Sequence, residues 1–548
     1  MQLVISLFKP DYLARRRRAL RPLFWLSGAL LGLLAGACAR EPYGPPNARP
    51  PEPAGRPLPP SPDSVRGMSA GRHYNRCGRL YRAVFGAHYR SVWAAPVTAP
   101  VLDLAHAAPG GGPLQFDKAG GGFQSISLSL RAPDGREFAL RALDKDPRKT
   151  LPGVLRKTFL LNAVRDATSA INPYAALVVP PLAEAAGVIP THPRLVYVQP
   201  DEAGLGKLSG RLRGQLALLE EKYSGPANQP AALAGARELL DSEPMLARVY
   251  ADPRQRLDQA ALLRARLLDV WLGDWDRHSG QWQWAAFRGK DGRTRFQALP
   301  KDRDQVFFRF DDGALPWLVS RLVPKFQTFR ARYGSVPGLV RQARFIDERG
   351  LVGASRADFQ RAASLLQARL PDSLLARALH RLPPAVYGLV GPGTAAALRA
   401  RRAALPAAAE QFYRRLARRP VVGGTAQAER FVVRRTADSV TVSVFSAGLG
   451  ADSLLFRRTF LPGETRQLTL EGLAGDDVFD IETAAAARPA SRVRLRLVGG
   501  AGTDRVRGAG PARRLVFYDD QPATGPSERV APRPLPRRYP RYDRLSDN

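Results

Sequence analysis

The sequence predicts an α+β protein with a two-lobed body followed by an all-β C-terminal domain. Residues 67–210 mix alternating strand patterns, turn signals and short helical runs. Residues 211–418 are dominated by amphipathic helical periodicity. Residues 419–520 are dominated by short runs of Val, Thr, Phe and Leu, which predict strands. A chain of 548 residues has room for two or three such domains.

The first 38 residues predict an export signal. Arg15 to Arg18 form a positive region, Leu23 to Leu34 form a short apolar region, and Ala35-Gly36-Ala37-Cys38 ends the segment. This pattern resembles a bacterial lipoprotein signal, which implies a lipidated Cys38, attachment to a membrane and a place in the cell envelope. The alternative is an uncleaved N-terminal anchor. Either interpretation places the chain outside the cytoplasm.

Both ends of the exported chain predict disorder. Residues 39–66 are rich in Pro and form the expected tether, and residues 521–548 form the expected tail. Cys77 is the only cysteine besides Cys38, so a lipidated Cys38 leaves no pair for an internal disulfide.

The net charge of +34 predicts affinity for anionic surfaces such as phospholipid or lipopolysaccharide. It does not indicate a specific nucleic-acid partner. Arginine is spread over the whole chain, and no zinc-ligand spacing or RNA-binding strand motif occurs.

The first lobe contains the following expected elements in chain order. A helix covers residues 72–93, and a glycine run precedes a strand at residues 125–130. The turn Pro133-Asp134-Gly135 returns the chain into a second strand at residues 137–143. Helical runs at 154–187 and a strand at 194–198 complete the lobe.

The second lobe carries two acidic clusters on predictable elements. A helix over residues 255–272 leads into the loop Asp274–Gln281, and a hairpin at 282–299 follows. The second cluster, Asp302-Arg303-Asp304, comes directly after that hairpin, and residues 315–418 are mainly helical. Phosphoryl-transfer enzymes need carboxylates to orient the attacking hydroxyl and to hold the metal on the phosphates.

Phosphate-binding residues are also present in the first lobe. Gly120, Gly121 and Gly122 would let backbone N–H groups approach phosphates, with Gln124 and Ser125 as further donors. A plain flexible turn is the alternative interpretation.

Arg141 ends the next strand, and Lys145 follows it; either cation suits a phosphate. Asp166 or Glu184, on the helical segment that follows, could hold the cation in place.

This order of parts resembles a protein-kinase fold, and Asp276-Arg277-His278 resembles the catalytic loop of atypical kinases. The similar families are the HipA toxin kinases, the spore-coat kinases and the secretory-pathway kinases of animals. The resemblance implies ATP with Mg²⁺ or Mn²⁺ as cofactors. It also implies that Asp276 orients the acceptor hydroxyl, that Arg141 and Lys145 serve catalysis, and that Asp304, Asp302 and Gln281 serve the metal. The pattern departs from these families at Arg141, where they have Lys, and at Gln281, where one form has Asn.

A second resemblance covers residues 78 to 350. The phrases Leu140–Pro147, Asn172–Ala176 and Gly273–His278 are similar to an uncharacterised region of Bacteroidota envelope proteins that join a phosphoesterase to an outer-membrane barrel. A phosphoesterase site in this chain is disfavoured, because the chain has six His and only His278 has Asp-x-His spacing.

An interpretation without catalysis also remains open. The acidic clusters could form salt-bridge networks that tie the helix to the hairpin. The protein would then be a non-catalytic envelope module that binds a protein partner or a glycan.

The C-terminal domain contains two Gly-Asp turns, Gly472–Phe479 and Gly499–Val506. Each resembles a single copy of the calcium-binding nonapeptide of β-rolls. Two copies separated by a long strand segment are few for a roll, so a β-sandwich or a short solenoid is the expected alternative.

Overall fold

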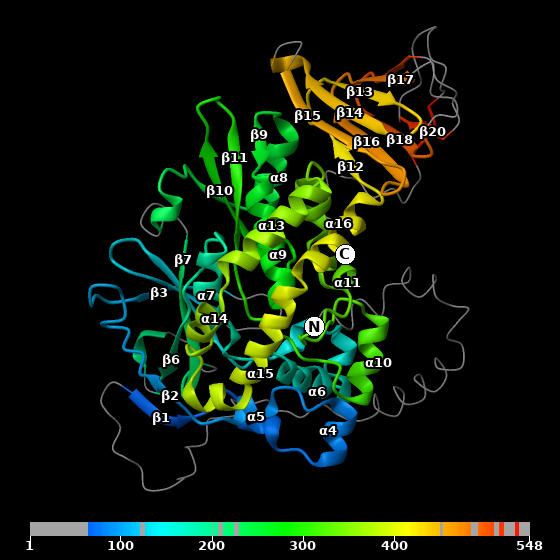
Figure 1. Ribbon diagram of the computed structural model, residues 1–548. Helices are drawn as coiled ribbons and strands as arrows, with labels where there is room; N and C mark the ends of the chain where they lie inside the picture. The colour runs from blue at the N-terminus through cyan, green and yellow to red at the C-terminus, as the bar shows by residue number, and fades with distance from the viewer. Residues whose placement is uncertain are drawn as a thin grey trace.

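The computed structural model describes residues 64–120, 127–200, 202–205, 212–223, 230–449, 453–483, 491–508, 514–519 and 532–535. Cys38, residues 39–63 and almost all of the C-terminal tail lie outside these residues, so the predictions for them stay predictions. Residues 64–66, the end of the predicted tether, belong to strand β1 (Ser64–Met68). Figure 1 shows a mixed α/β body with a β-rich C-terminal part at one end. In the described part of the chain, no helix is both long enough and apolar enough to cross a membrane.

A five-stranded antiparallel sheet organises the N-terminal part of the body. Its strand order is β3-β4-β5-β7-β6. The strands are β3 (Gln115–Gly120), β4 (Ser127–Arg131), β5 (Glu137–Ala142), β6 (Arg194–Val198) and β7 (Gln215–Lys222). The predicted turn at Pro133-Asp134-Gly135 joins β4 to β5, and β6 matches its predicted range. A separate pair, β1 (Ser64–Met68) and β2 (Val97–Pro100), precedes the sheet.

The helix expected over residues 72–93 is broken. A 3₁₀ turn at Arg72–Asn75 is followed by α4 (Arg79–Phe85) and α5 (Arg90–Ala94). Gly86 separates the two helices with φ +95°, which L side chains rarely adopt. The helical runs expected at 154–187 are α6 (Phe159–Asp166) and α7 (Ala175–Ala185), and Gly187 ends them with φ +70°.

The second part of the body combines helices with a four-stranded sheet of order β8-β10-β11-β9. Its strands are β8 (Leu239–Asp241), β9 (Gln255–Leu257), β10 (Trp282–Arg288) and β11 (Thr294–Pro300). Its helices are α8 (Ser242–Ala251), α9 (Gln259–Leu272), α10 (Ala314–Leu322), α11 (Val336–Leu339), α12 (Arg344–Gly350), α13 (Arg356–Arg369), α14 (Asp372–Leu379), α15 (Pro384–Ala403) and α16 (Leu405–Ala417).

Helix α9 begins later than the sequence predicts. Residues 255–257 pair in parallel with β11 and form β9 instead of the first helical turn. Asp258 then caps the helix, because its Oδ1 accepts a hydrogen bond from the backbone N–H of Ala261 at 2.9 Å.

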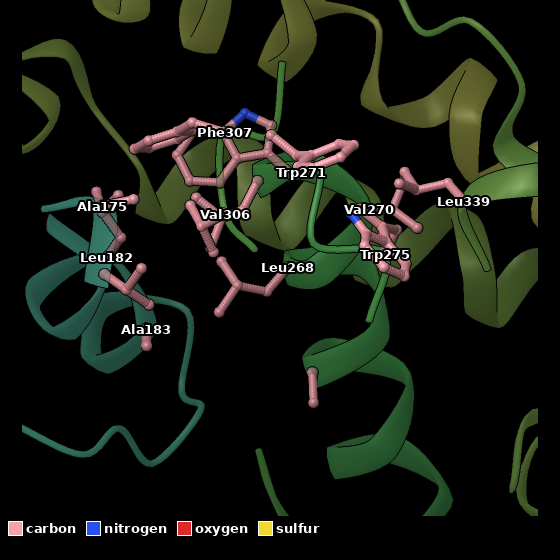
Figure 2. Packing of buried hydrophobic residues seen from close by; sticks show 14 of the residues in the cluster. Ala175, Leu182, Ala183, Leu268, Val270, Trp271, Trp275, Val306, Phe307 and Leu339 are labelled. Carbon is pink, nitrogen blue, oxygen red and sulfur yellow. The ribbon is translucent and has the colours of Figure 1, made fainter. Parts of the chain in front are cut away.

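The main core fixes the two segments that carry the acidic clusters. Leu268 and Trp271 of α9 are fully buried, and Figure 2 shows them packed beside Val306 and Phe307, with α7 on the other side. Each side chain of this size contributes about 1.5–3 kcal/mol by burial. The core therefore anchors the end of α9 and the chain just after Asp304 to the same scaffold.

The C-terminal part is a short parallel β-solenoid with an inserted hairpin. One sheet has the order β12-β16-β18-β20 with parallel neighbours throughout, and the second has the order β15-β14-β13-β17-β19. Its strands are β12 (Val421–Gly423), β13 (Glu429–Arg435), β14 (Val440–Ser446), β15 (Ser453–Phe460), β16 (Gln467–Ala474), β17 (Val478–Thr483), β18 (Arg494–Ala501), β19 (Arg505–Arg507) and β20 (Leu515–Tyr518). Of the two expected alternatives, the structure has the solenoid.

The Gly-Asp turns form a ladder of buried acids inside the solenoid. Asp477 Oδ1 accepts the backbone N–H of Glu429 at 2.7 Å, and Asp504 Oδ1 accepts that of Asp477 at 2.9 Å. The acids thereby link one coil to the next.

Candidate active site

Arg141 stands near the end of β5 between two carboxylates. Its Nη1 lies 2.8 Å from Oε2 of Glu220 on β7 and 3.5 Å from Oδ1 of Asp302. Burial lowers the pKa of Arg141, but the charges of Asp302 and Glu220 outweigh burial and raise that pKa above its ordinary value. Arg141 therefore joins the first lobe to the second acidic cluster.

The prediction that Asp166 or Glu184 holds this cation is wrong. Asp166 accepts two hydrogen bonds of 2.6 Å from Arg90, and Glu184 lies 2.8 Å from His192. Glu220 takes the role because β5 and β7 are adjacent. Arg141 faces Leu218 across the pair, so Glu220, two residues further along, lies diagonally on the same face.

Lys145 follows β5 and forms an ion pair with Asp304. Burial lowers the pKa of Lys145, but the charges of Asp304 and Asp302 raise that pKa above its ordinary value. Lys145 is therefore a charged ammonium at neutral pH. The two cations expected to grip phosphates both lie against the second acidic cluster.

The glycine run leaves the first sheet level with Arg141. Gly120, the last residue of β3, is paired with Ser127 of β4, and Ser127 is paired with Arg141. Two strand spacings separate the backbones of Gly120 and Arg141, which is about 10 Å. Gly121, Gly122, Gln124 and Ser125 lie outside the described residues.

The first acidic cluster lies on the loop after α9. Gly273 ends the helix in the left-handed region, with φ +75°, and the loop carries Asp274 and Asp276. Asp276 is half-buried, and its Oδ1 lies 3.5 Å from Nε2 of Gln342. Asp276 is close enough to Asp304 for its charge to help raise the pKa of that carboxyl.

The arginines between the acidic residues point into the core. Arg303 lies between Asp302 and Asp304 in the sequence, but its side chain is buried against Asp269 and Asp274. Arg277 follows Asp276, and its buried side chain pairs with Asp274.

Arg266 extends this network. It donates to Asp269 at 2.6 Å and to Asp347 at 2.8 and 3.1 Å. The salt-bridge interpretation therefore holds for Asp274, which pairs with Arg277 and Arg303. Asp302 and Asp304 also form ion pairs, but with Arg141 and Lys145 of the first lobe and not with their neighbouring arginines. Asp276 is half-buried and contacts Gln342.

Arg277 also holds the two acidic loops together. Its guanidinium donates to the backbone carbonyls of Lys301 at 2.8 Å and of Asp302 at 2.9 Å. Asp302 has φ +54°, a conformation that side chains other than Gly, Asn and Asp rarely adopt. Arg277 thus fixes the backbone on which Asp302 and Asp304 stand.

Asp302 and Asp304 have opposite pKa shifts. Burial raises the pKa of Asp304, and the charge of Asp302 raises it further, although Lys145 opposes both. Burial also acts to raise the pKa of Asp302, but Arg141 and Lys145 outweigh it and hold that pKa below its ordinary value. The pair carries one firmly ionised carboxylate and one that is easier to protonate.

Gln281 completes a set of oxygen ligands suited to a hard cation. Its Nε2 donates to Asp302 Oδ2 at 3.3 Å, and its Oε1 is buried without a hydrogen-bond partner in the described part of the chain. Carboxylate and carboxamide oxygens are the ligands that Mg²⁺ prefers. Within the described residues, no three His, Cys, Asp or Glu side chains are grouped tightly enough to form a metal cluster. A metal would therefore rely on Asp302, Asp304 and the free Gln281 oxygen.

Sequence reasoning missed Glu220 and Gln342. Glu220 has a weak signal, since it is the first charged residue after the apolar run Leu216–Leu219 of β7. Gln342 has none, because its proximity to Asp276 depends on how the 3₁₀ turn Arg341–Ala343 packs against the loop.

Comparison with known proteins finds only distant structural likeness. No protein-family model matches the sequence, and no curated protein matches it. The Golgi casein kinase solved with Mn and ADP bound shares 13% identity with a TM-score of 0.24. Another structure of the Golgi casein kinase shares 11% identity with a TM-score of 0.23. In both cases the match covers 55% of this chain and 72% of the other. At these scores the likeness decides nothing about activity.

Proposed function

We propose that the site around Asp276 and Asp304 transfers a phosphoryl group from ATP to a hydroxyl of an acceptor. One observation carries the proposal: two cations of the first lobe, Arg141 and Lys145, converge on the half-buried acids of the second lobe. This is the combination that phosphoryl transfer requires, with cations for the phosphates and carboxylates for metal and acceptor.

Each side chain has a defined task in this proposal. Asp302, Asp304 and Gln281 would hold Mg²⁺ or Mn²⁺, and the ion would offset charge on the phosphates. Arg141 and Lys145 bind phosphate oxygens. Asp276 accepts the proton of the acceptor hydroxyl. The hydroxyl oxygen attacks the terminal phosphorus of ATP, and ADP leaves.

The ion pairs of the site support the proposal, because their partners can be exchanged when a metal–nucleotide complex binds. Lys145 is paired with Asp304 and Arg141 with Asp302, so each acid is already neutralised by a cation. A metal–nucleotide complex would replace both partners at once. The metal would neutralise the acids, and the phosphates would neutralise Arg141 and Lys145. Binding therefore exchanges ion pairs and leaves no charge buried alone.

The proposed setting is the cell envelope, with the chain attached to a membrane through Cys38. The export signal and the cysteine that ends it support this setting.

The test is calorimetric binding of ATP to the full chain with Mg²⁺ or Mn²⁺. Asp304→Asn removes one proposed metal ligand, whereas Asp291→Asn changes an exposed Asp in the β10–β11 turn and serves as the matched control. We expect metal-dependent binding that Asp304→Asn weakens by at least about tenfold, since metal-site residues commonly cost 10- to 100-fold. No binding with either metal in a folded sample would refute the proposal. A non-catalytic module that binds a protein or a glycan would then take its place.

A further inference from the structure

Two neighbouring helices of the body are apolar in sequence and yet lie on the surface. Helix α10 reads Ala-Leu-Pro-Trp-Leu-Val-Ser-Arg-Leu, and Pro316 is its only buried residue. Helix α4 contains Leu80, Tyr81, Val84 and Phe85, and none of its residues is buried. Val319 and Leu322 pack against the main core, and Phe85 packs against Tyr81 and Phe159. Leu80 and Trp317 are the large apolar side chains of the two helices that stay exposed.

The two helices pack against each other and form one surface, which we call the α4–α10 face. Gly313, just before α10, touches the backbone of Gly86, just after α4, so the ends of the two helices meet. The two helices are also in contact with each other, and Figure 1 shows them as neighbours. Leu80 of α4 is 80% exposed and Trp317 of α10 is 48% exposed.

The α4–α10 face is positively charged. Arg76, Arg79 and Arg321 are exposed on it or at its edge, and neither helix contains an acidic residue. The guanidinium of Arg321 stacks over the ring of Trp317 at 5.0 Å from its centre.

The acids beside the two helices already have cationic partners. Asp166, which interacts with Tyr81 of α4, lies 2.6 Å from Arg90. Just before α10, Asp311 lies 2.6 Å from Arg330, and Asp312 lies 2.6 Å from His88 and 3.3 Å from Arg309.

We propose that the α4–α10 face lies on an anionic phospholipid surface. Trp and Leu side chains favour the boundary between headgroups and acyl chains. Arginines beside them attract anionic headgroups and can extend their charged ends toward water. Strand β1, where the described chain begins, lies at the same end of the molecule as α4 in Figure 1. A chain attached to a membrane through Cys38 would keep this end of the body within reach of that membrane. The proposal does not depend on phosphoryl transfer.

Trp317 provides a direct test. Five other tryptophans of the described residues, Trp93, Trp271, Trp275, Trp282 and Trp284, are at most 3% exposed, so Trp317 is the one that can meet lipid. The full chain carrying Trp25→Phe is reconstituted into vesicles of phosphatidylglycerol mixed with phosphatidylcholine whose acyl chains are brominated or plain. Subtracting the spectrum of the additional Trp317→Phe variant isolates the emission of Trp317. We expect bromine to quench that emission by about half, because a ring at the interface meets the acyl chains.

Two exposed leucines give a matched pair of variants. Leu80→Glu adds a negative charge to the α4–α10 face, and Leu389→Glu adds the same charge on α15, where Leu389 is 51% exposed. Leu80→Glu should abolish most of the quenching, and Leu389→Glu should leave it unchanged. Both positions are exposed, so circular dichroism should show the same fold for both variants.

Three outcomes would overturn the proposal. The first is equal Trp317 emission in brominated and plain anionic vesicles. The second is equal quenching in vesicles of phosphatidylcholine alone, which would remove the role of charge. The third is a Trp317 already shielded from iodide without vesicles, which would mean that another protein segment covers the face.

Discussion

Replacing Asp269 by Asn should strongly destabilise the body, because Asp269 is the centre of a buried network with balanced charge. The network contains three carboxylates and three guanidiniums: Asp269, Asp274, Asp347, Arg266, Arg277 and Arg303. Asp269 is 0% exposed and accepts from both Arg266 and Arg303. The substitution keeps the shape of the side chain and leaves the buried network with one more positive than negative charge, although Arg266 keeps Asp347 and Arg303 keeps Asp274 as partners.

The expected loss is about 3–5 kcal/mol, the cost of breaking a buried ion pair by removing one partner. The exposed pair Asp291–Arg295, with an N–O distance of 2.8 Å, gives the matched control. Asp291→Asn should cost less than about 1 kcal/mol, because water screens that pair.

Urea unfolding followed by tryptophan fluorescence is the assay, since Trp271 and Trp275 lie on the same helix and loop as the network. The double variant Asp269→Asn with Arg303→Gln restores the charge balance and should recover about half of the loss. A loss below about 1 kcal/mol for Asp269→Asn alone would refute the reasoning. So would a double variant no more stable than the single one.

Three further predictions concern other parts of the chain. Gly472→Ala should destabilise the solenoid by about 1–3 kcal/mol in thermal unfolding, because a Cβ there would stand 1.9 Å from Asp477 Oδ2. A Cβ at Gly463 would have no atom within 4 Å, so Gly463→Ala should change stability by less than about 0.5 kcal/mol. Equal effects at the two glycines would contradict the argument. Burial raises the pKa of Asp477 to about 9. An Asp in the unfolded chain has a pKa of about 4. The contribution of Asp477 to the free energy of unfolding is therefore complete below that pH and is lost as pH rises through about 9. The melting temperature of the solenoid should therefore fall over this range, and an unchanged slope in Asp477→Asn would argue against that source. Ser355→Ala should cost about 1 kcal/mol of α13 stability, because Ser355 and Asp358 form a reciprocal capping box; chemical denaturation that shows no loss would rule this out.

Local pattern was enough to predict the elements that carry the site. The turn at Pro133-Asp134-Gly135, strand β6 and the β10–β11 hairpin were predictable because their signals are short-range. The start of α9 was not predictable, because β9 forms only when β11 lies beside it. The solenoid could not be separated from a sandwich for the same reason, since both have strands of similar length and differ only in which strands pair.

The candidate site divides in the same way. Asp276, Asp302 and Asp304 could be found because carboxylates cluster visibly in the sequence. The partner of Arg141 could not, because Glu220 is distant in sequence and reaches Arg141 only across β5 and β7. The side chains of Asp302 and Arg303 contact different parts of the body, Asp302 facing Arg141 and Arg303 facing Asp269. This arrangement depends on the positive φ of Asp302, which no residue pattern indicated.

Coils of different length stack in register in the solenoid, and this makes its length a modular property. Paired residues are 27 apart between β16 and β18, as in Leu468 and Leu495, and 20 apart between β18 and β20, as in Leu495 and Leu515. Asp477 and Asp504 occupy equivalent places in neighbouring coils and are 27 residues apart, whereas Glu429 and Asp477 are 48 apart because the β14–β15 hairpin is inserted between them. Duplication of one 27-residue unit would add a coil that continues both sheets and the acid ladder in register. The candidate site lies in the body, in a different part of the chain. The gain or loss of a coil would therefore change the length of the solenoid without altering the residues of the candidate site.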